Sequence, residues 1–225
     1  GFYQSAGVSL FESNPTISHV TISDNTGIGM DIENSSPILN HMTIVGNNGA
    51  FWIDLLVSEN EGGVILKNSI VWDNGEVILC SDEFHPDGFW IYCDNDDEDY
   101  RYGLVASYSD IEGGFEGEGN INDNPHFTDP ENGDYPYNLH GDYTLQEGSP
   151  CIDAGIADID GDGIDDIIGY FGNAPDMGVF EYSWDCEGVW YGAAIEDCNG
   201  VCNGQAIIDE CGMCAEGNTG LEENL

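Results

Sequence analysis

Basic residues are almost absent from this chain. Lys67 and Arg101 are its only lysine and arginine, against 44 aspartates and glutamates, and the formal net charge is -42. A surface of this charge repels the phosphates of nucleic acids and of anionic membranes, so neither is expected as a partner. It suits high ionic strength, which screens the repulsion, and it suits divalent cations.

Long hydrophobic runs are missing as well. No stretch approaches the roughly 18 apolar residues of a membrane span, which predicts no membrane insertion in this segment. No signal peptide precedes Gly1. We therefore expect a fragment of a longer polypeptide, with its targeting segment outside these residues.

A repeat dominates the first part of the chain. Asn14–Gly27 is echoed by Ser36–Gly49, and more loosely by Gly63–Gly75. A period in the low twenties is typical of a solenoid, whose repeats bury their apolar faces by stacking. The alternation of apolar and polar residues indicates strands rather than helices. We expect stacked coils in which one interior row holds Ile22, Ile44 and Ile70.

Asparagine and histidine mark the bends of these coils. Asn25, Asn47 and Asn74 follow the strands, where asparagine tolerates left-handed backbone and its amide can bond the next coil. His19 and His41 are expected to stack on each other at a bend. Lys67 is assigned the same repeat position.

Eight cysteines predict an oxidising compartment. Cys80 and Cys93 bracket a polar, aromatic segment, so residues 80–103 are interpreted as a loop insertion tied by a disulfide. Cys151 stands alone and is expected to be a buried thiol.

The other five cysteines crowd into the C-terminal part, where one half-repeat begins at Asp185 and the next at Asp197. In an oxidising compartment we expect disulfides among them, with an odd cysteine whose partner lies beyond Leu225. The spacing also allows a zinc site, which would use Cys198, Cys202, Cys211 and Cys214.

The order of motifs from Val105 to Tyr182 carries a resemblance to a known family. Gly119–Phe127, Gly141–Leu145, Ser149–Gly155 and Pro175–Tyr182 together resemble the closing portion of secreted bacterial right-handed parallel β-helix proteins of the pectate-lyase-like superfamily. The resemblance implies an all-β right-handed parallel β-helix over residues 1–182, capped near its end, and an extracellular or cell-surface location. Residues 183–225 resemble the short Cys/Gly repeats that are appended to extracellular bacterial proteins.

The sharpest local motif is the acidic segment Asp158–Asp166. Alternate carboxylates with interspersed glycines let a chain wrap its oxygens around one hard cation. The segment resembles the calcium repeats of thrombospondin type 3 and dockerin modules, which offers as ligands Asp158, Asp160, Asp162, Asp166 and the carbonyl of Ile164. Gly169 stands where an EF-hand supplies a bidentate glutamate, so an unliganded acidic turn is the alternative. The run Asp94–Asp99 is a second, weaker calcium candidate.

Catalytic machinery is sparse. A polysaccharide lyase of this superfamily needs a cationic group beside calcium, and only Lys67 and Arg101 could serve. A glycoside hydrolase needs paired carboxylates on one face, for which Asp31 and Asp54 are the candidates, with Trp52 as a sugar platform. The first hypothesis is therefore a non-catalytic stalk or adhesion module, calcium-stabilised, with carbohydrate or cell-surface partners. The second is a fragment of a polysaccharide-degrading enzyme, a glycoside hydrolase or lyase.

Overall fold

The computed structural model describes residues 5–54, 63–79, 103–130, 141–183, 186–189, 194–209 and 212–221. The chain divides into two compact units, Gly1–Glu181 and Tyr182–Leu225, which are described separately. No helix long and apolar enough to cross a membrane occurs in the described residues. The elements are β1 (Ala6–Phe11), β2 (Thr16–Ser23), β3 (Ile28–Glu33), β4 (Ile38–Val45), β5 (Gly49–Asp54), β6 (Val64–Lys67), β7 (Ile70–Trp72), β8 (Ile78–Leu79), β9 (Leu104–Ser107), β10 (Asp110–Ile111), β11 (Phe127–Asp129), β12 (Asp142–Leu145), β13 (Ile207–Ile208) and β14 (Cys214–Ala215).

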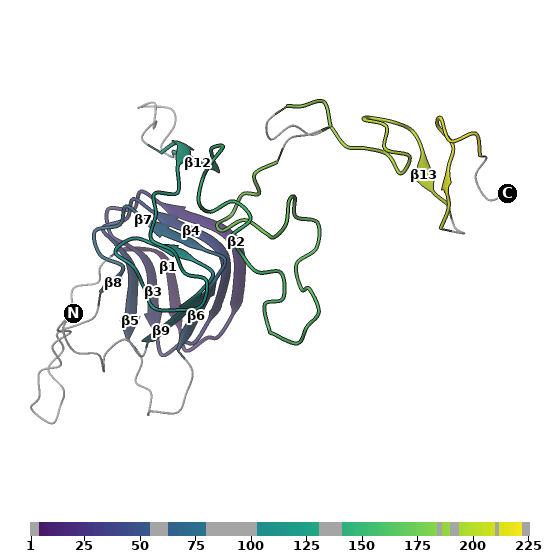
Figure 1. Ribbon diagram of the computed structural model, residues 1–225. Helices are drawn as coiled ribbons and strands as arrows, with labels where there is room; N and C mark the ends of the chain where they lie inside the picture. The colour runs from purple at the N-terminus through teal and green to yellow at the C-terminus, as the bar shows by residue number, and fades with distance from the viewer. Residues whose placement is uncertain are drawn as a thin grey trace, which may run out of the picture. The chain divides into compact units, whose positions relative to one another are not determined.

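Two parallel sheets form the body of the first unit and curl around a common core (Figure 1). One has the strand order β1-β3-β5-β8. In the other, β2 pairs with β4, β4 pairs with β6 and β7, and these continue into β9 and β10. Pro15 and Pro37 lie just before β2 and β4, where the missing N–H costs no ladder hydrogen bond. The fold is therefore all-β with parallel sheets.

The strand register places apolar side chains of successive repeats opposite one another. Ile17 pairs with Leu39, and Leu39 pairs with Leu66. In the other sheet Leu10 pairs with Ile32, which pairs with Ile53. Because alternate residues of a strand face the same side, these pairs form continuous rows. The fully buried members include Met30, Ile32, Leu39, Met42, Ile44, Phe51, Leu66 and Val71, each 0% exposed.

One expected row is wrong by one position. Ile22 does pair with Ile44, but Ile44 pairs with Val71, while Ile70 lies opposite Thr43. The offset between the second and third repeats is longer than that between the first and second, and it is constant from the pair Ile38–Ile65 to the pair Val45–Trp72. Val71 therefore occupies the position that was assigned to Ile70, although both side chains are buried.

The assignment of Lys67 to the histidine position is also wrong. Lys67 lies opposite Asn40, so Asn68 follows as the equivalent of His41. The backbone agrees, because His41 and Asn68 both have φ of 49°, and His19 has φ of 55°. The two histidine rings stack as expected, with centroids 4.7 Å apart and planes inclined by 10°.

The asparagines after the strands form a hydrogen-bonded ladder, as predicted. The Oδ1 of Asn47 accepts the backbone N–H of Asn25 at 3.1 Å and its Nδ2 at 2.8 Å. The Oδ1 of Asn74 accepts the same two groups of Asn47, at 3.1 and 3.0 Å. Each asparagine thus joins its own bend to the next repeat.

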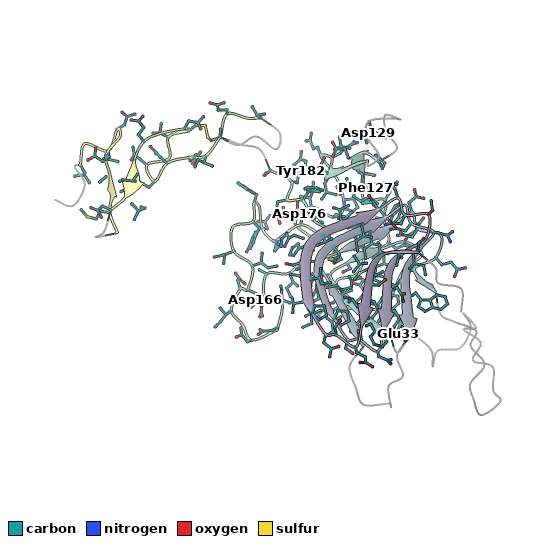
Figure 2. All side chains as sticks on the ribbon, turned by 180° about the vertical axis from the view of Figure 1, so that it is seen from behind. Glu33, Phe127, Asp129, Asp166, Asp176 and Tyr182 are labelled. Atoms are coloured by element: carbon teal, nitrogen blue, oxygen red, sulfur yellow. A yellow bond between two sulfur atoms is a disulfide. The ribbon has the colours of Figure 1, made fainter. Side chains whose placement is uncertain are left out.

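Residues 121–130 and 141–181 follow these sheets in the chain and contact them, as in the hydrogen bond from Tyr143 Oη to Asp24 and that from the Val179 N–H to Thr43. β11 and β12 pair in antiparallel fashion, and the rings of Phe127 and Tyr143 meet edge-on with centroids 5.3 Å apart. Figure 2 labels Phe127 and Asp129 at the two ends of β11. Cys151 is a free thiol and fully buried, as expected. Gly178 has φ of 91°, and a Cβ there would lie 2.8 Å from Ile70 Cδ1, so only glycine lets the backbone pass this closely.

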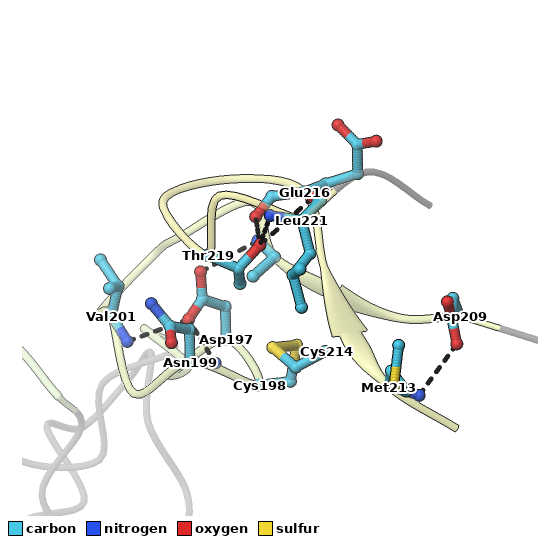
Figure 3. Close-up of a disulfide and its surroundings, with 11 residues drawn as sticks. Asp197, Cys198, Asn199, Val201, Asp209, Met213, Cys214, Glu216, Thr219 and Leu221 are labelled. Atoms are coloured by element: carbon cyan, nitrogen blue, oxygen red, sulfur yellow. Dashed lines mark hydrogen bonds between the residues drawn. A yellow bond between two sulfur atoms is a disulfide. The ribbon is translucent and has the colours of Figure 1, made fainter. Parts of the chain in front are cut away.

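Two interlaced disulfides hold the C-terminal unit, Cys186–Cys202 and Cys198–Cys214. Figure 3 shows the second of them. The zinc alternative is therefore wrong, because three of its four thiolates are oxidised. Asp197 caps a turn by accepting the N–H groups of Asn199, Val201 and Ala206, at 3.0 Å each. Asp209 accepts the N–H of Met213 in the same way at 2.8 Å.

The expected Cys80–Cys93 disulfide lies outside the described residues. Two disulfides in so short a unit indicate an oxidising compartment.

Candidate metal centre

The acidic segment Asp158–Asp166 folds into a loop around its own carboxylates. Asp158 Oδ1 accepts the N–H groups of Gly161 and Asp162, at 2.7 and 3.1 Å, and its Oδ2 accepts that of Gly163 at 2.8 Å. Asp166 Oδ2 closes the loop by accepting the N–H of Ile159 at 2.8 Å. Gly161 and Gly163 have φ of 78° and 88°, so the two glycines supply the left-handed backbone that the turn requires.

Three of the predicted ligands come together in this loop. Asp158, Asp160 and Asp166 each offer a carboxylate oxygen, and these oxygens lie within 4.8 Å of one another. Calcium binds oxygen at about 2.3–2.6 Å, so two ligands on opposite sides of the ion lie about 4.6–5.2 Å apart. Asp158 Oδ2 and Asp160 Oδ1 each accept one N–H, from Gly163 and Asp162, and each keeps a further lone pair for a cation. The donor set therefore fits a hard divalent cation such as calcium.

The two other predicted ligands occupy different places. Asp162 lies outside the group of three, and its Oδ1 accepts the N–H of Ile164 at 2.8 Å. The side chain of Ile164 is 70% exposed and has no atom that could bind a metal, so only its backbone carbonyl could be a ligand. The second calcium candidate, Asp94–Asp99, lies outside the described residues.

The loop is attached to the sheets by polar contacts from one short segment. Lys67 Nζ, at the end of β6, donates to the carbonyl of Ile159. The neighbouring Asn68 holds Ile156 twice, donating to its carbonyl at 2.9 Å and accepting its N–H at 2.8 Å. Lys67 thus contacts the loop itself, and its contact is electrostatically favourable beside five aspartates. Figure 2 shows Asp166 in this loop, outside the sheets.

Of the two residues that were candidates for catalysis, Asp31 lies on the outer face of β3, and Asp54 is the last residue of β5. Asp31 pairs with Trp52, and Glu33 pairs with Asp54. Asp31 and Asp54 are therefore diagonal neighbours, two positions apart along the strands and about 8 Å apart in backbone position. The flanking Met30 and Ile32 are buried, so Asp31 and Glu33 face outward. Asp31 is half-buried, Glu33 is exposed, and the side chain of Asp54 lies outside the described residues.

Glu33 is the member of this face that sequence reasoning missed. It is the residue directly opposite Asp54, whereas Asp31 faces an indole. Aligning the two repeats on the buried residues Met30 and Phe51, rather than on Gly27 and Gly49, would have predicted this register.

A buried pair, Asp110 and Cys151, was not predicted either. Both residues are 0% exposed, and the Cys151 thiol donates to Asp110 Oδ2 at 3.2 Å. Asp110 Oδ1 accepts the N–H of Asp123 at 3.2 Å. Burial raises the pKa of Asp110 to about 6, and burial likewise raises the pKa of the Cys151 thiol. A thiol held in its protonated form is a poor nucleophile, so this pair belongs to the core rather than to a reactive site.

Comparison of the chain with protein-family models, with curated proteins and with solved structures gives no match.

Proposed function

We propose that residues 1–182 form a right-handed parallel β-helix and that the chain serves as a non-catalytic stalk or adhesion segment of a secreted or cell-surface protein. The observation that carries this proposal is the parallel register, in which equivalent residues of β2, β4 and β7 lie opposite one another. The asparagine ladder supports it, because such a ladder needs successive bends stacked in line. The β-helix proteins of the pectate-lyase-like superfamily remain the family that the closing motifs resemble.

The placement of the basic residues supports a structural role. Lys67 donates to the Ile159 carbonyl, and β6 belongs to a different sheet from Asp31 and Glu33. Arg101 lies outside the described residues. Of the two cations that could serve a lyase mechanism, the one in the described residues, Lys67, therefore holds a loop. The disulfide-bonded C-terminal unit suits a spacer in an oxidising, extracellular setting.

Calcium is proposed as a clamp on the closing segment. Asp158, Asp160 and Asp166 would hold the ion, and the loop is joined to the sheets through Lys67 and Asn68. Neutralising the crowded carboxylates would favour the folded loop, and the contacts of the loop would transmit that stabilisation to the sheets.

Calcium at 100 times its Kd should therefore stabilise the first unit by about 2.7 kcal/mol. For a unit of this size that corresponds to a rise in Tm of roughly 5–10 °C, which chelation should reverse. Asp160→Ala should abolish the rise, because it removes one of the three converging carboxylates. Calorimetric titration and thermal unfolding, each with and without a chelator, measure both effects.

The matched control is Asp165→Ala, which removes the same carboxylate from an exposed residue of the same loop that is not in the group of three. It should keep the calcium response. If the unaltered chain takes up no calcium and its Tm does not change, the loop is an acidic turn that binds no metal.

The outer face of β3 and β5 favours a second candidate, an enzyme fragment acting on neutral glycans. Glu33 pairs with Asp54 in the register of β3 and β5, and Trp52 is two residues before Asp54 along β5. Paired carboxylates separated by roughly 5–9.5 Å are the requirement for glycoside hydrolysis. The same face, without turnover, would bind sugar through the Trp52 ring.

We expect the purified chain to release no reducing sugar from neutral polysaccharides, because neither acid of this face whose side chain the structure describes is buried: Glu33 is exposed and Asp31 only half-buried. Incubation with a panel of neutral glycans measures this. Sugar release that Asp54→Asn abolishes would make the chain an enzyme and would displace the stalk proposal.

A further inference from the structure

The first strands of both sheets are edge strands at the same end of the stack. Within the described residues, β1 pairs only with β3, and β2 pairs only with β4. Both therefore present a row of backbone N–H and C=O groups on the side away from the stack. Such an edge is a template for one more strand.

The interior rows of apolar side chains reach this end of the stack, where their last members are less buried than the rest. Val8, Leu10, Ile17 and Val20 are only half-buried, whereas their partners Met30, Ile32, Leu39 and Met42 are all 0% exposed. A cavity of about 520 Å³ lies along the same edge, lined among others by Val8, Val20, Ile22, Tyr143 and Phe180. Apolar surface is thus left for a partner to cover, and covering it is favourable.

The polarity of the asparagine ladder specifies how the partner must run. In each step the Oδ1 of the later repeat accepts N–H groups of the earlier repeat. Asn25 belongs to the first described repeat, and no described residue donates to its Oδ1. The Nδ2 of Asn25 donates to the carbonyl of Ser23, two residues back, as the Nδ2 of Asn47 donates to that of Val45. The two side chains are therefore held alike, and Asn25 Oδ1 suits the bend of an earlier repeat, running parallel to β1 and β2.

We propose that this end is a docking edge for one further repeat of the same class, which adds its strands in parallel to β1 and β2 and donates from its bend to Asn25 Oδ1. The occupant is an apolar-alternating, asparagine-ended segment in continuity with the stacking already seen between β2 and β4. A second copy of the chain meets this edge poorly. A twofold axis would pair β1 with β1 in the antiparallel direction, and two chains of net charge -42 repel each other.

The test supplies the occupant within the chain. A copy of the repeat at positions 27–48 is joined directly to Ser5 in place of the segment 1–4, which keeps the register of the stack because Ala6 pairs with Ile28. Amide hydrogen exchange should slow at least tenfold at the outward N–H groups of β1 and β2, and Tm should rise by several degrees. Amides of β4 and β7 should stay protected, which reports that the original stack is intact.

The control fusion carries serine at the copied positions of Met30, Leu39 and Ile44, which removes the apolar row and keeps the length. A synthetic peptide with the sequence of positions 27–48, added to the unfused chain, should give the same protection saturably. Unchanged exchange at β1 and β2 in both formats, or equal protection by the serine fusion, would overturn the proposal. So would a mass that doubles with concentration in the unfused chain while these amides become protected, since a second copy would then be the occupant. None of these readouts depends on calcium.

Discussion

Replacing Asn47 by alanine should lower the free energy of unfolding of the first unit by about 3–5 kcal/mol, as expected when a buried hydrogen-bond network is broken. Asn47 is 4% exposed, and its side chain makes five hydrogen bonds. Two are accepted from Asn25, and the two N–H groups of Nδ2 are shared among three acceptors, the carbonyls of Ile22 and Val45 and Asn74 Oδ1. Alanine would leave the backbone N–H of Asn25 without this acceptor, at a cost of about 1–3 kcal/mol before relaxation, and would remove one hydrogen bond from each of the other groups, at about 0.5–1.5 kcal/mol each. Urea unfolding followed by circular dichroism measures the loss.

Asn48→Ala is the matched control for this variant. Asn48 is the next residue, is exposed, and joins the stack through its backbone N–H, which donates to the carbonyls of Asn25 and Gly27. Its substitution should cost no more than about 0.5 kcal/mol. Similar losses for the two variants would mean that the ladder contributes little to the stability of the stack.

Asp110→Asn should stabilise the first unit by up to about 3 kcal/mol at neutral pH. Asp110 is fully buried, and burial raises its pKa from the ordinary 3.8 to about 6. The difference of about 2 pKa units corresponds to about 3 kcal/mol. The asparagine amide has the shape of the carboxyl group and keeps an oxygen for the Asp123 N–H without a buried charge.

The pH dependence of this gain has a definite sign. Below pH 3.8 the carboxyl group is protonated in both the folded and the unfolded chain, so the variant gains little. As pH rises from 3.8 to about 6, the unfolded chain loses its proton first, so the unaltered protein is progressively destabilised. The difference in unfolding free energy between variant and parent should therefore grow across this window and stay constant above it.

The titration of His41 has the opposite effect on stability over nearly the same pH range. Burial, and then the nearby charge of His19, lower its pKa from 6.5 to about 4, so its contribution to stability is lost as pH falls through that interval. Comparing Asp110→Asn with its parent at each pH cancels the histidine effect. Asp73→Asn, at an exposed residue with φ of 52°, removes a charge without a buried site and should show no such trend. A flat difference for Asp110→Asn from pH 4 to 7 would contradict the raised pKa.

The sequence predicted the strands, their parallel stacking and the asparagine ladder because each repeat carries the same local signals. The pairing of Ile17 with Leu39 follows from the spacing of the first two repeats alone. The third repeat was misplaced by one position because its offset is longer, and apolar residues at both 70 and 71 hide the correct alternation. Asn74 bonds Asn47 in the ladder, so residues at equal distances before these two asparagines lie opposite each other. Ile44 is three residues before Asn47, and the residue three before Asn74 is Val71.

The site was predictable to the extent that it is local. Asp158, Asp160 and Asp166 lie in one short segment, so the glycine turns between them bring their oxygens together. The contact of Asp110 with Cys151 has a sequence separation of 41, and that of Lys67 with Ile159 has one of 92. Such contacts depend on how the closing segment returns to the sheets, which no short-range pattern in the sequence specifies.

The contact between Lys67 and Ile159 allows the attachment of the acidic loop to be followed by chemical labelling of one natural residue. Lys67 is the only lysine, so apart from the terminal amine a single ε-amino group is open to acylation. While that ammonium donates to the loop, it is held away from an electrophile, and it becomes reactive when the loop departs. The rate of amine labelling at one residue thus follows the detachment of the closing segment, without any engineered probe.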